Sequence, residues 1–232
     1  GPRMVKPEFL NRTNAIGIAN GLAWTSIGGE TLPIEVQVID NGSGKITVTG
    51  SLGDVMKESA QLAITYARVH AAEYGIDSER LKKCDLHIHA PEGAVPKDGP
   101  SAGVTLTTAL ISCLSGIPVR GDVAMTGEIT LHGNVLPIGG LREKSMAAYR
   151  EGMKTVLIPK DNVSDLYEVD DEVKKNIQFL PMSNLAQVLN AALLKPKTVS
   201  ARHSHPGKKA KKPADAAAIP QTTEQPKPGA VC

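Results

Sequence analysis

The sequence predicts an α+β fold in which mixed sheets are packed with helices. Strict alternation of apolar and polar residues marks a half-buried strand over residues 32–38. Apolar residues at helical spacing mark two longer helices, over Asp54 to Tyr74 and over Ser101 to Leu114. Aromatic residues make up only 3% of the 232 residues, so aliphatic residues and alanine must fill the core.

The elements before residue 90 are predicted mainly from alternation and from glycine. In order, they are a strand over Ala15 to Thr25, a turn at Gly28-Gly29, the strand over 32–38, the helix over Asp54 to Tyr74 with Gly75 as its cap, and a short strand containing Leu86 and Ile88. Asn41-Gly42 with Gly44 is typical of a hairpin loop. Ile46 to Thr49 is therefore expected to return as the partner of the strand over 32–38.

A loop rich in glycine and proline runs directly into a serine at the start of a helical pattern. The loop reads Pro96-Lys97-Asp98-Gly99-Pro100-Ser101-Ala102-Gly103. Gly99 and Pro100 prevent a regular element before Ser101, so the serine is expected in the first turn of the helix. Free backbone N–H groups and the positive end of the helix dipole lie there. Such a position can stabilise an oxyanion.

The elements after this helix alternate between short strands and helices. They are strands over Val123 to Thr130 and Asn134 to Ile138, a helix over Leu141 to Glu151 capped by Gly152, a strand over Val156 to Ile158, a short helix over Asp161 to Tyr167, a strand over Ile177 to Leu180, and a helix over Asn184 to Leu194 capped by Ser183. The stretch Gly139-Gly140-Leu141 opens the helix that contains Lys144 in its first turn.

A serine and a lysine at two helix starts suggest a Ser-Lys hydrolase. A lysine can take the serine proton only when it is neutral, and its free pKa is about 10.4. Burial or nearby positive potential must lower that pKa to ~7–8. The first turn of a helix disfavours a cation, and apolar residues surround Lys144 in sequence. The alternative is an exposed lysine on an amphipathic helix.

Other reactive residues fit a structural reading better. His87 and His89 would share one strand face, as metal ligands do, but an exposed strand face explains them without a third ligand. Cys84, Cys113 and Cys232 are widely spaced, which indicates neither a disulfide framework nor a zinc site. Buried reduced thiols are the expected state of Cys84 and Cys113.

Composition divides the chain into parts. Residues 1–3 resemble an expression remnant, and residues 4–194 are expected to form the folded domain. Residues 195–232 are rich in lysine, proline and alanine and are expected to be disordered. The basic run at residues 208–212 could contact nucleic acid, but a solvated basic tail is the favoured interpretation. No apolar run approaches the ~20 residues that cross a membrane. A cytoplasmic location is expected.

Several segments resemble the proteolytic domain of Lon proteases of the bacterial and mitochondrial type. They are the serine loop at residues 96–103, the stretch over residues 127–144 that ends at Lys144, the segment 21–25 around Trp24, and the segment 119–128. The resemblance covers Ala15 to about Leu193. It implies the α+β fold of that domain, which is similar to the second domain of ribosomal protein S5. Val95 departs from the family pattern, where threonine is more usual.

The resemblance assigns roles to individual residues. Ser101 would be the nucleophile and Lys144 the general base of a serine endopeptidase. Thr126 would hold the lysine amine by a hydrogen bond, and Asp98 and Gly99 would shape the turn before the serine. Trp24 would line the groove that binds an extended peptide. Its alternative role is core packing.

The resemblance also implies what the longer protein contains. Lon proteases of this type carry an ATPase module, but no Gly-x-x-x-x-Gly-Lys-Ser/Thr loop occurs in this sequence. No cofactor is expected for this fragment, while ATP and magnesium belong to the full-length protein. The implied partners are unfolded polypeptides and further copies of the chain in a homohexamer, with no membrane and no nucleic acid. A catalytically silent peptide-binding domain of the same fold is the rival reading.

Overall fold

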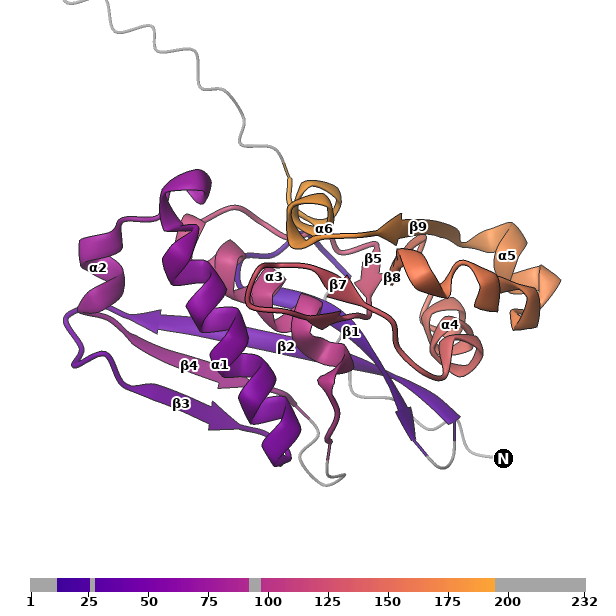
Figure 1. Ribbon diagram of the computed structural model, residues 1–232, viewed down its shortest axis with the longest axis horizontal. Coiled ribbons are helices and arrows are strands. Elements are labelled where there is room, and N and C mark those ends of the chain that lie inside the picture. The colour runs from indigo at the N-terminus through magenta and orange to yellow at the C-terminus, as the bar shows by residue number, and fades with distance from the viewer. Residues whose placement is uncertain (1–11, 26–27, 92–96, 195–232) are drawn as a thin grey trace, which may run out of the picture. The chain divides into compact units, whose positions relative to one another are not determined.

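A computed structural model describes residues 12–25, 28–91 and 97–194 of the chain (Figure 1). Within these residues, the main sheet has seven strands in the order β3-β4-β2-β1-β5-β8-β9. The strands are β1 (Ile18–Thr25), β2 (Gly28–Ile39), β3 (Ile46–Thr49), β4 (Asp85–His89), β5 (Val123–Met125), β8 (Thr155–Pro159) and β9 (Gln178–Met182). Strands β6 (Glu128–Ile129) and β7 (Val135–Leu136) pair in a separate small sheet. The predicted mixed sheets are confirmed.

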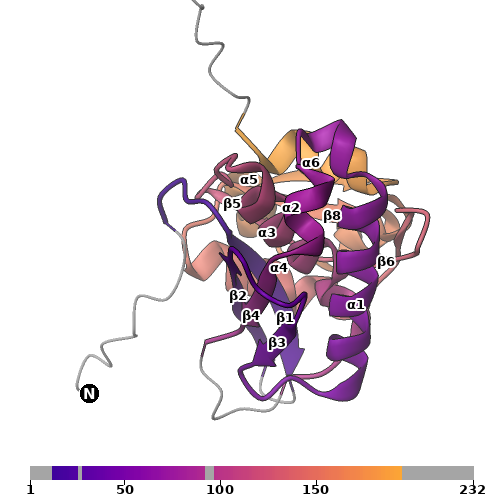
Figure 2. The same cartoon turned by 90° about the vertical axis from the view of Figure 1, so that its left-hand side faces the viewer.

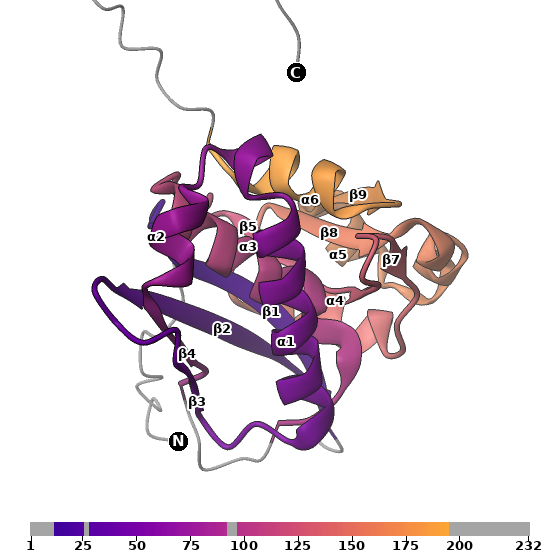
Figure 3. The same ribbon diagram turned by 60° about the vertical axis from the view of Figure 1, so that its left-hand side comes forward.

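The helices are α1 (Asp54–Val69), α2 (Ser78–Lys82), α3 (Gly103–Ser115), α4 (Leu141–Arg150), α5 (Asp171–Asn176) and α6 (Leu185–Ala192). Short 3-10 turns cover Ala71–Tyr74, Pro100–Ala102, Lys160–Asn162 and Ser164–Glu168. Helices α1 and α3 lie on the same face of β1 and β2 (Figures 2 and 3). The expected helix over Leu141 to Glu151 is confirmed, whereas α2 and α5 were not predicted because each is too short to show a helical period.

Alternating side chains of the central strands feed two hydrophobic clusters on opposite faces of the sheet. On β1, Ala19 belongs to the larger cluster with α1 and α3, while Leu22 belongs to the smaller one with α4 and α5. On β5, Met125 faces the larger cluster and Ala124 the smaller. Because successive side chains of a strand point to opposite faces, helices pack on both sides of β1 and β5. This arrangement brings the starts of α3 and α4 to one region of the molecule.

The predicted hairpin between the strand over 32–38 and Ile46 to Thr49 is wrong. Strand β4 lies between them, antiparallel to β2 and parallel to β3. The Asp85 carboxylate explains the insertion, because its Oδ1 accepts hydrogen bonds from the amides of Ser43 at 2.7 Å and Lys45 at 2.8 Å. The loop over residues 41–44, which resembled a tight hairpin, is thereby bound to the first residue of β4, and β4 lies between β2 and β3.

Two glycines predicted to form a turn belong instead to a strand. Gly28 and Gly29 are the first residues of β2 and pair with Thr25 and Trp24. A Cβ atom on Gly29 would collide with the backbone carbonyl of Glu143 in α4. The glycine is therefore needed for the close approach of β2 to the first turn of α4.

Three further boundaries differ from prediction. The first helix ends at Val69 and continues after His70 as a 3-10 turn, with Gly75 as the predicted left-handed cap at φ 67°. The predicted strand over Val123 to Thr130 is divided between β5 and β6, which belong to different sheets. The cap of α6 is Asn184, whose Oδ1 accepts from the Gln187 amide at 3.0 Å, and not Ser183.

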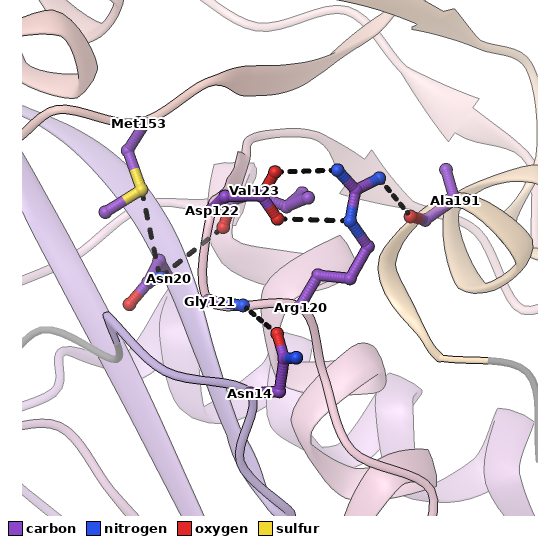
Figure 4. A network of polar contacts seen from close by, with 8 residues as sticks. All are labelled: Asn14, Asn20, Arg120, Gly121, Asp122, Val123, Met153 and Ala191. Atoms are coloured by element: carbon purple, nitrogen blue, oxygen red, sulfur yellow. Dashed lines mark hydrogen bonds and ion pairs between the residues drawn. The ribbon is translucent and has the colours of Figure 1, made fainter.

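A polar network anchors the start of β5 (Figure 4). The Arg120 guanidinium donates to both Asp122 oxygens, at 3.1 and 2.7 Å, and to the Ala191 carbonyl at 3.3 Å. The Gly121 amide donates to Asn14 Oδ1 at 3.0 Å. The strand that follows is therefore fixed to α6 and to the N-terminal segment, and its other end leads directly to Thr126.

The described residues lie within one compact unit, Gly1–Pro196. The predicted remnant at residues 1–3 and the predicted tail at 195–232 lie outside the described residues, as do Val95 and Pro96 of the serine loop. In the part of the chain that is described, no helix is both long and apolar enough to cross a membrane.

Candidate active site

A cavity of about 550 Å³ lies where β1, β2 and the starts of α1, α3 and α4 meet. Ser101 and Lys144 both line it, although they lie 43 positions apart in sequence. The remaining lining residues are Ala23, Trp24, Thr25, Glu30, Leu32, Met56, Lys97, Asp98, Gly99, Pro100, Ala102, Pro137, Ile138 and Gly139. The two helix starts singled out from the sequence therefore converge on one space.

Ser101 lies in a 3-10 turn, Pro100–Ala102, immediately before α3. Ser101 was expected in the first turn of α3, but it lies in the short 3-10 turn that precedes this helix. Gly99 precedes the turn with φ 127° and ψ 155°, a conformation that residues with a side chain rarely adopt. The loop can therefore present Ser101 in this way only with glycine at position 99.

The Asp98 carboxylate holds the serine loop against the start of α1. Its Oδ1 accepts from the Gly99 amide at 2.9 Å and from the Met56 amide at 3.1 Å. Met56 lies in the first turn of α1, where Gly53 has no side chain to satisfy the free amides. Asp98 therefore serves as a cap supplied from another segment of the chain.

The backbone around Ser101 is also tied to the segment after β5. The Gly127 amide donates to the Ser101 carbonyl at 2.8 Å, and the Val104 amide donates to the Gly127 carbonyl at 3.1 Å. The Thr126 hydroxyl donates to the same Ser101 carbonyl at 3.5 Å, a long contact. The serine turn thus rests on residues that β5 positions.

Lys144 is buried in the first turn of α4, with only 3% of its surface exposed. Its Nζ donates to Thr126 Oγ1 at 3.2 Å. No carboxylate forms an ion pair with it among the described residues. Burial lowers the pKa of Lys144 to about 8, because the charged form loses its hydration. The alternative of an exposed lysine is excluded, and the amine can be neutral in a substantial fraction of molecules near neutral pH.

Comparison with known proteins places this site in a family. The profile described as the Lon protease (S16) C-terminal proteolytic domain matches residues 1–195. The chain belongs to this family. Similar proteins include the Lon proteases of Brevibacillus choshinensis, 55% identical over 194 residues and 82% of this chain, and of Haemophilus influenzae, 57% identical over 183 residues and 79% of this chain.

The chain covers only part of these relatives. It spans 25% of the Brevibacillus protein and 23% of the Haemophilus protein. The Lon protease of Chloroflexus aggregans gives the same picture, at 52% identity over 83% of this chain and 23% of that protein. The similarity is therefore to the peptidase portion of Lon protease.

Trp24 lies at the rim of the cavity in this Lon-type domain. Its side chain is 62% exposed, so the alternative role in core packing is excluded. The ring contacts the α4 start, because a Cβ on Gly140 would meet Trp24 within 3 Å. The indole thus forms a wall of the cavity that a ligand can contact.

The histidines of β4 lie apart from the cavity. His87 Nε2 and His89 Nδ1 both contact Thr49 Oγ1, at 3.0 and 2.7 Å, on an exposed part of the sheet. Among the described residues, no group of three or more histidine, cysteine or acidic side chains could hold a metal ion. The reading of this pair as an exposed strand face agrees with their position.

One buried contact at the cavity wall was not predicted from the sequence. Asn162, only 3% exposed, forms two hydrogen bonds with the backbone of Ile138. The two residues lie 24 positions apart, Ile138 between β7 and α4 and Asn162 in the 3-10 turn after β8, so no local pattern could have indicated that they meet.

Proposed function

We propose that this chain is the serine endopeptidase portion of an ATP-dependent Lon protease. Ser101 is the nucleophile and Lys144 is the general base. The observation that carries the proposal is the buried Lys144 amine, with its pKa lowered to about 8, in the cavity that Ser101 lines. A hydroxyl needs a nearby base to become nucleophilic, and a neutral lysine is such a base.

The proposed reaction is acyl transfer in two steps. Neutral Lys144 takes the proton of Ser101 as Oγ attacks the scissile carbonyl, and the protonated lysine then gives that proton to the leaving amine. Water attacks the resulting ester with Lys144 again as base, which restores the serine hydroxyl and releases the second product. The Ser101 amide, at the positive end of the turn that leads into α3, supports the developing oxyanion.

An extended peptide is the substrate that fits the cavity. In the described part of the chain, strand β1 pairs with β5 through Asn20 and Gly21, and β1 continues past them through Leu22, Ala23 and Trp24. From Leu22 to Trp24, the edge of β1 that faces β5 therefore has no strand partner among the described residues. The main chain of a polypeptide can add to such an edge, beside Trp24, and only an unfolded segment can adopt that conformation.

Further properties of the whole protein are part of this proposal. ATP and magnesium are assigned to a module outside this sequence, because no Gly-x-x-x-x-Gly-Lys-Ser/Thr loop occurs in it. The Lys144-Ser145 pair in α4 does not form such a loop, because Glu143 and not glycine precedes the lysine. Assembly as a homohexamer, action on unfolded or damaged proteins and a cytoplasmic location follow from kinship with Lon proteases. No step of the peptidase reaction depends on them.

The proposal is tested with the purified chain and an unstructured fluorogenic peptide. We expect cleavage without added nucleotide, and loss of cleavage in Ser101→Ala with the melting temperature retained. A small serine-reactive fluorophosphonate should label the wild-type chain and not the variant. Retained turnover in Ser101→Ala would refute the nucleophile assignment, and a folded wild-type chain that neither labels nor cleaves would favour the silent peptide-binding domain.

A further inference from the structure

Asn162 pairs with the cavity wall in the manner of a neighbouring strand. It ends the 3-10 turn Lys160–Asn162 that follows β8. Its Oδ1 accepts from the Ile138 amide at 2.9 Å, and its Nδ2 donates to the Ile138 carbonyl at 2.8 Å. One side chain thus satisfies both backbone groups of one residue, at distances typical of good hydrogen bonds.

Asp165 fixes the orientation of this amide. Asn162 Nδ2 also donates to Asp165 Oδ2 at 2.6 Å. An asparagine amide has two N–H donors, and both are now engaged. In the opposite orientation, the amide oxygen of Asn162 would face the Asp165 carboxylate and the Ile138 carbonyl, and neither of these groups can donate a hydrogen bond. Only one orientation is therefore compatible with its surroundings, and the pairing with Ile138 is rigid.

The pairing determines where the neighbouring backbone groups point. In a planar trans peptide, the carbonyl and the N–H point in opposite directions. Because the Ile138 amide points to Asn162, the Pro137 carbonyl points away from it. Because the Ile138 carbonyl points to Asn162, the Gly139 amide also points away. No backbone hydrogen bond among the described residues engages either of these two groups.

Both groups belong to residues that line the catalytic cavity. Pro137, Ile138 and Gly139 lie in its wall, between β7 and the start of α4. A carbonyl and an amide that flank one residue on the same side are the pair that a neighbouring extended strand uses. A single residue of a bound peptide can donate its N–H to Pro137 and accept from Gly139.

We propose that Asn162, oriented by Asp165, is a positioning residue for substrate binding. It holds Ile138 so that the Pro137 carbonyl and the Gly139 amide face the peptide main chain. This inference rests on the proposed peptidase function, since it concerns the same cavity. Asn162 does not touch the reacting atoms, so its loss should weaken the binding of extended peptides more than it slows attack by Ser101.

Graded variants test the proposal. Asn162→Ala removes both bonds to Ile138, and Asn162→Asp keeps an acceptor for the Ile138 amide but places a carboxylate beside Asp165. The pair Asn162→Asp with Asp165→Asn restores a donor between positions 162 and 165. Asn176→Ala is the matched control, because Asn176 Nδ2 bonds Glu172 on exposed α5, away from the cavity.

The first readout separates binding from chemistry. For an extended peptide, KM should rise by about tenfold in Asn162→Ala, which corresponds to about 1.4 kcal/mol of binding, with a much smaller change in kcat. The rate of labelling by a small fluorophosphonate, which does not reach residues 137–139, should change less than about twofold. The double variant should have a lower KM than Asn162→Asp alone. Asn176→Ala should leave KM unchanged.

The second readout does not require turnover. Trp24 is the only tryptophan in the sequence and lines the cavity, so its fluorescence reports peptide binding in a Ser101→Ala background. Adding Asn162→Ala to that background should raise the Kd of the peptide by about the same factor as KM. Binding without cleavage in the wild type would refute the proposed function and leave this inference supported.

Two results would overturn the inference. One is an unchanged Kd and KM in a folded Asn162→Ala chain. The other is a loss of peptide cleavage and of fluorophosphonate labelling in equal measure, in proportion to a fall in melting temperature, because that pattern indicates a general structural role.

Discussion

Lys144 Nζ donates a 3.2 Å hydrogen bond to Thr126 Oγ1, and Thr126 in turn donates a longer one, 3.5 Å, to the Ser101 carbonyl. The single proton of the threonine hydroxyl is thereby directed at Ser101, so a lone pair of Oγ1 receives the lysine. A neutral amine bound in this way keeps its own lone pair available for another proton. The contact thus links the segment after β5 to both helix starts of the cavity.

Thr126→Val should lower the rate of Ser101 acylation by about tenfold or more, because the buried lysine amine loses its acceptor while the shape of the residue is kept. Thr126→Ser should restore most of the rate. The measurement is the second-order rate constant of Ser101 labelling by a fluorophosphonate, at a pH high enough that Lys144 is neutral. Thr130→Val is the control, since the Thr130 hydroxyl accepts from the Asn134 amide in the β6–β7 turn, away from Lys144. A Thr126→Val chain as fast as the wild type would show that this contact does not orient the base.

Asp98→Ala should reduce both stability and activity, because one carboxylate oxygen caps α1 and fixes the Gly99 turn. We expect the free energy of unfolding to fall by about 1–2 kcal/mol, as for loss of a helix cap. Urea unfolding and peptide cleavage measure the two effects.

Asp77→Ala is the matched control for Asp98, because Asp77 caps α2 through the Glu79 and Arg80 amides at a site away from the cavity. It should lose stability on a similar scale and keep its peptidase rate at temperatures where it is folded. If Asp98→Ala and Asp77→Ala lose activity equally, Asp98 has no particular influence on the serine loop.

Local signals in the sequence were sufficient to predict the two helix starts, but not the contacts between segments that lie far apart in the sequence. The breakers before Ser101 and the glycines before Lys144 act within a few residues, so both helix starts were predicted, although α3 itself begins at Gly103, after the 3-10 turn that contains Ser101. The partners of β3 and β4 could not be, because the Asp85 carboxylate joins a loop to a strand that lies 40 positions or more away in sequence. The same holds for Asn162 and Ile138. The contact of Thr126 with Lys144 was anticipated only through the family resemblance.

Lys144→Met should stabilise the fold at neutral pH. The folded pKa of about 8 lies below the ordinary value of 10.5, so below pH 8 folding must bury a charge that the unfolded chain leaves in water. This penalty is fully present below pH 8 and disappears as the pH rises to about 10.5. Its removal should add at most about 3 kcal/mol to the free energy of unfolding.

The pH dependence provides the check on this gain. The free energies of unfolding of Lys144→Met and of the wild type should differ most at pH 6–7 and converge above about pH 10.5. Lys154→Met, at an exposed position, should show no such trend. If Lys144→Met does not raise the free energy of unfolding at pH 7, or if its stabilising effect grows at alkaline pH, Lys144 is not a buried lysine with a lowered pKa.

The pH profile of Ser101 acylation tests most directly whether Lys144 takes the serine proton. The acylation rate of the wild type should rise with pH along a single ionisation near 8, the pKa that burial gives Lys144. Lys144→Arg should be inactive across that range, because arginine stays protonated. A limb near 10.5, or a Lys144→Arg chain that acylates at close to the wild-type rate, would contradict the Ser-Lys mechanism.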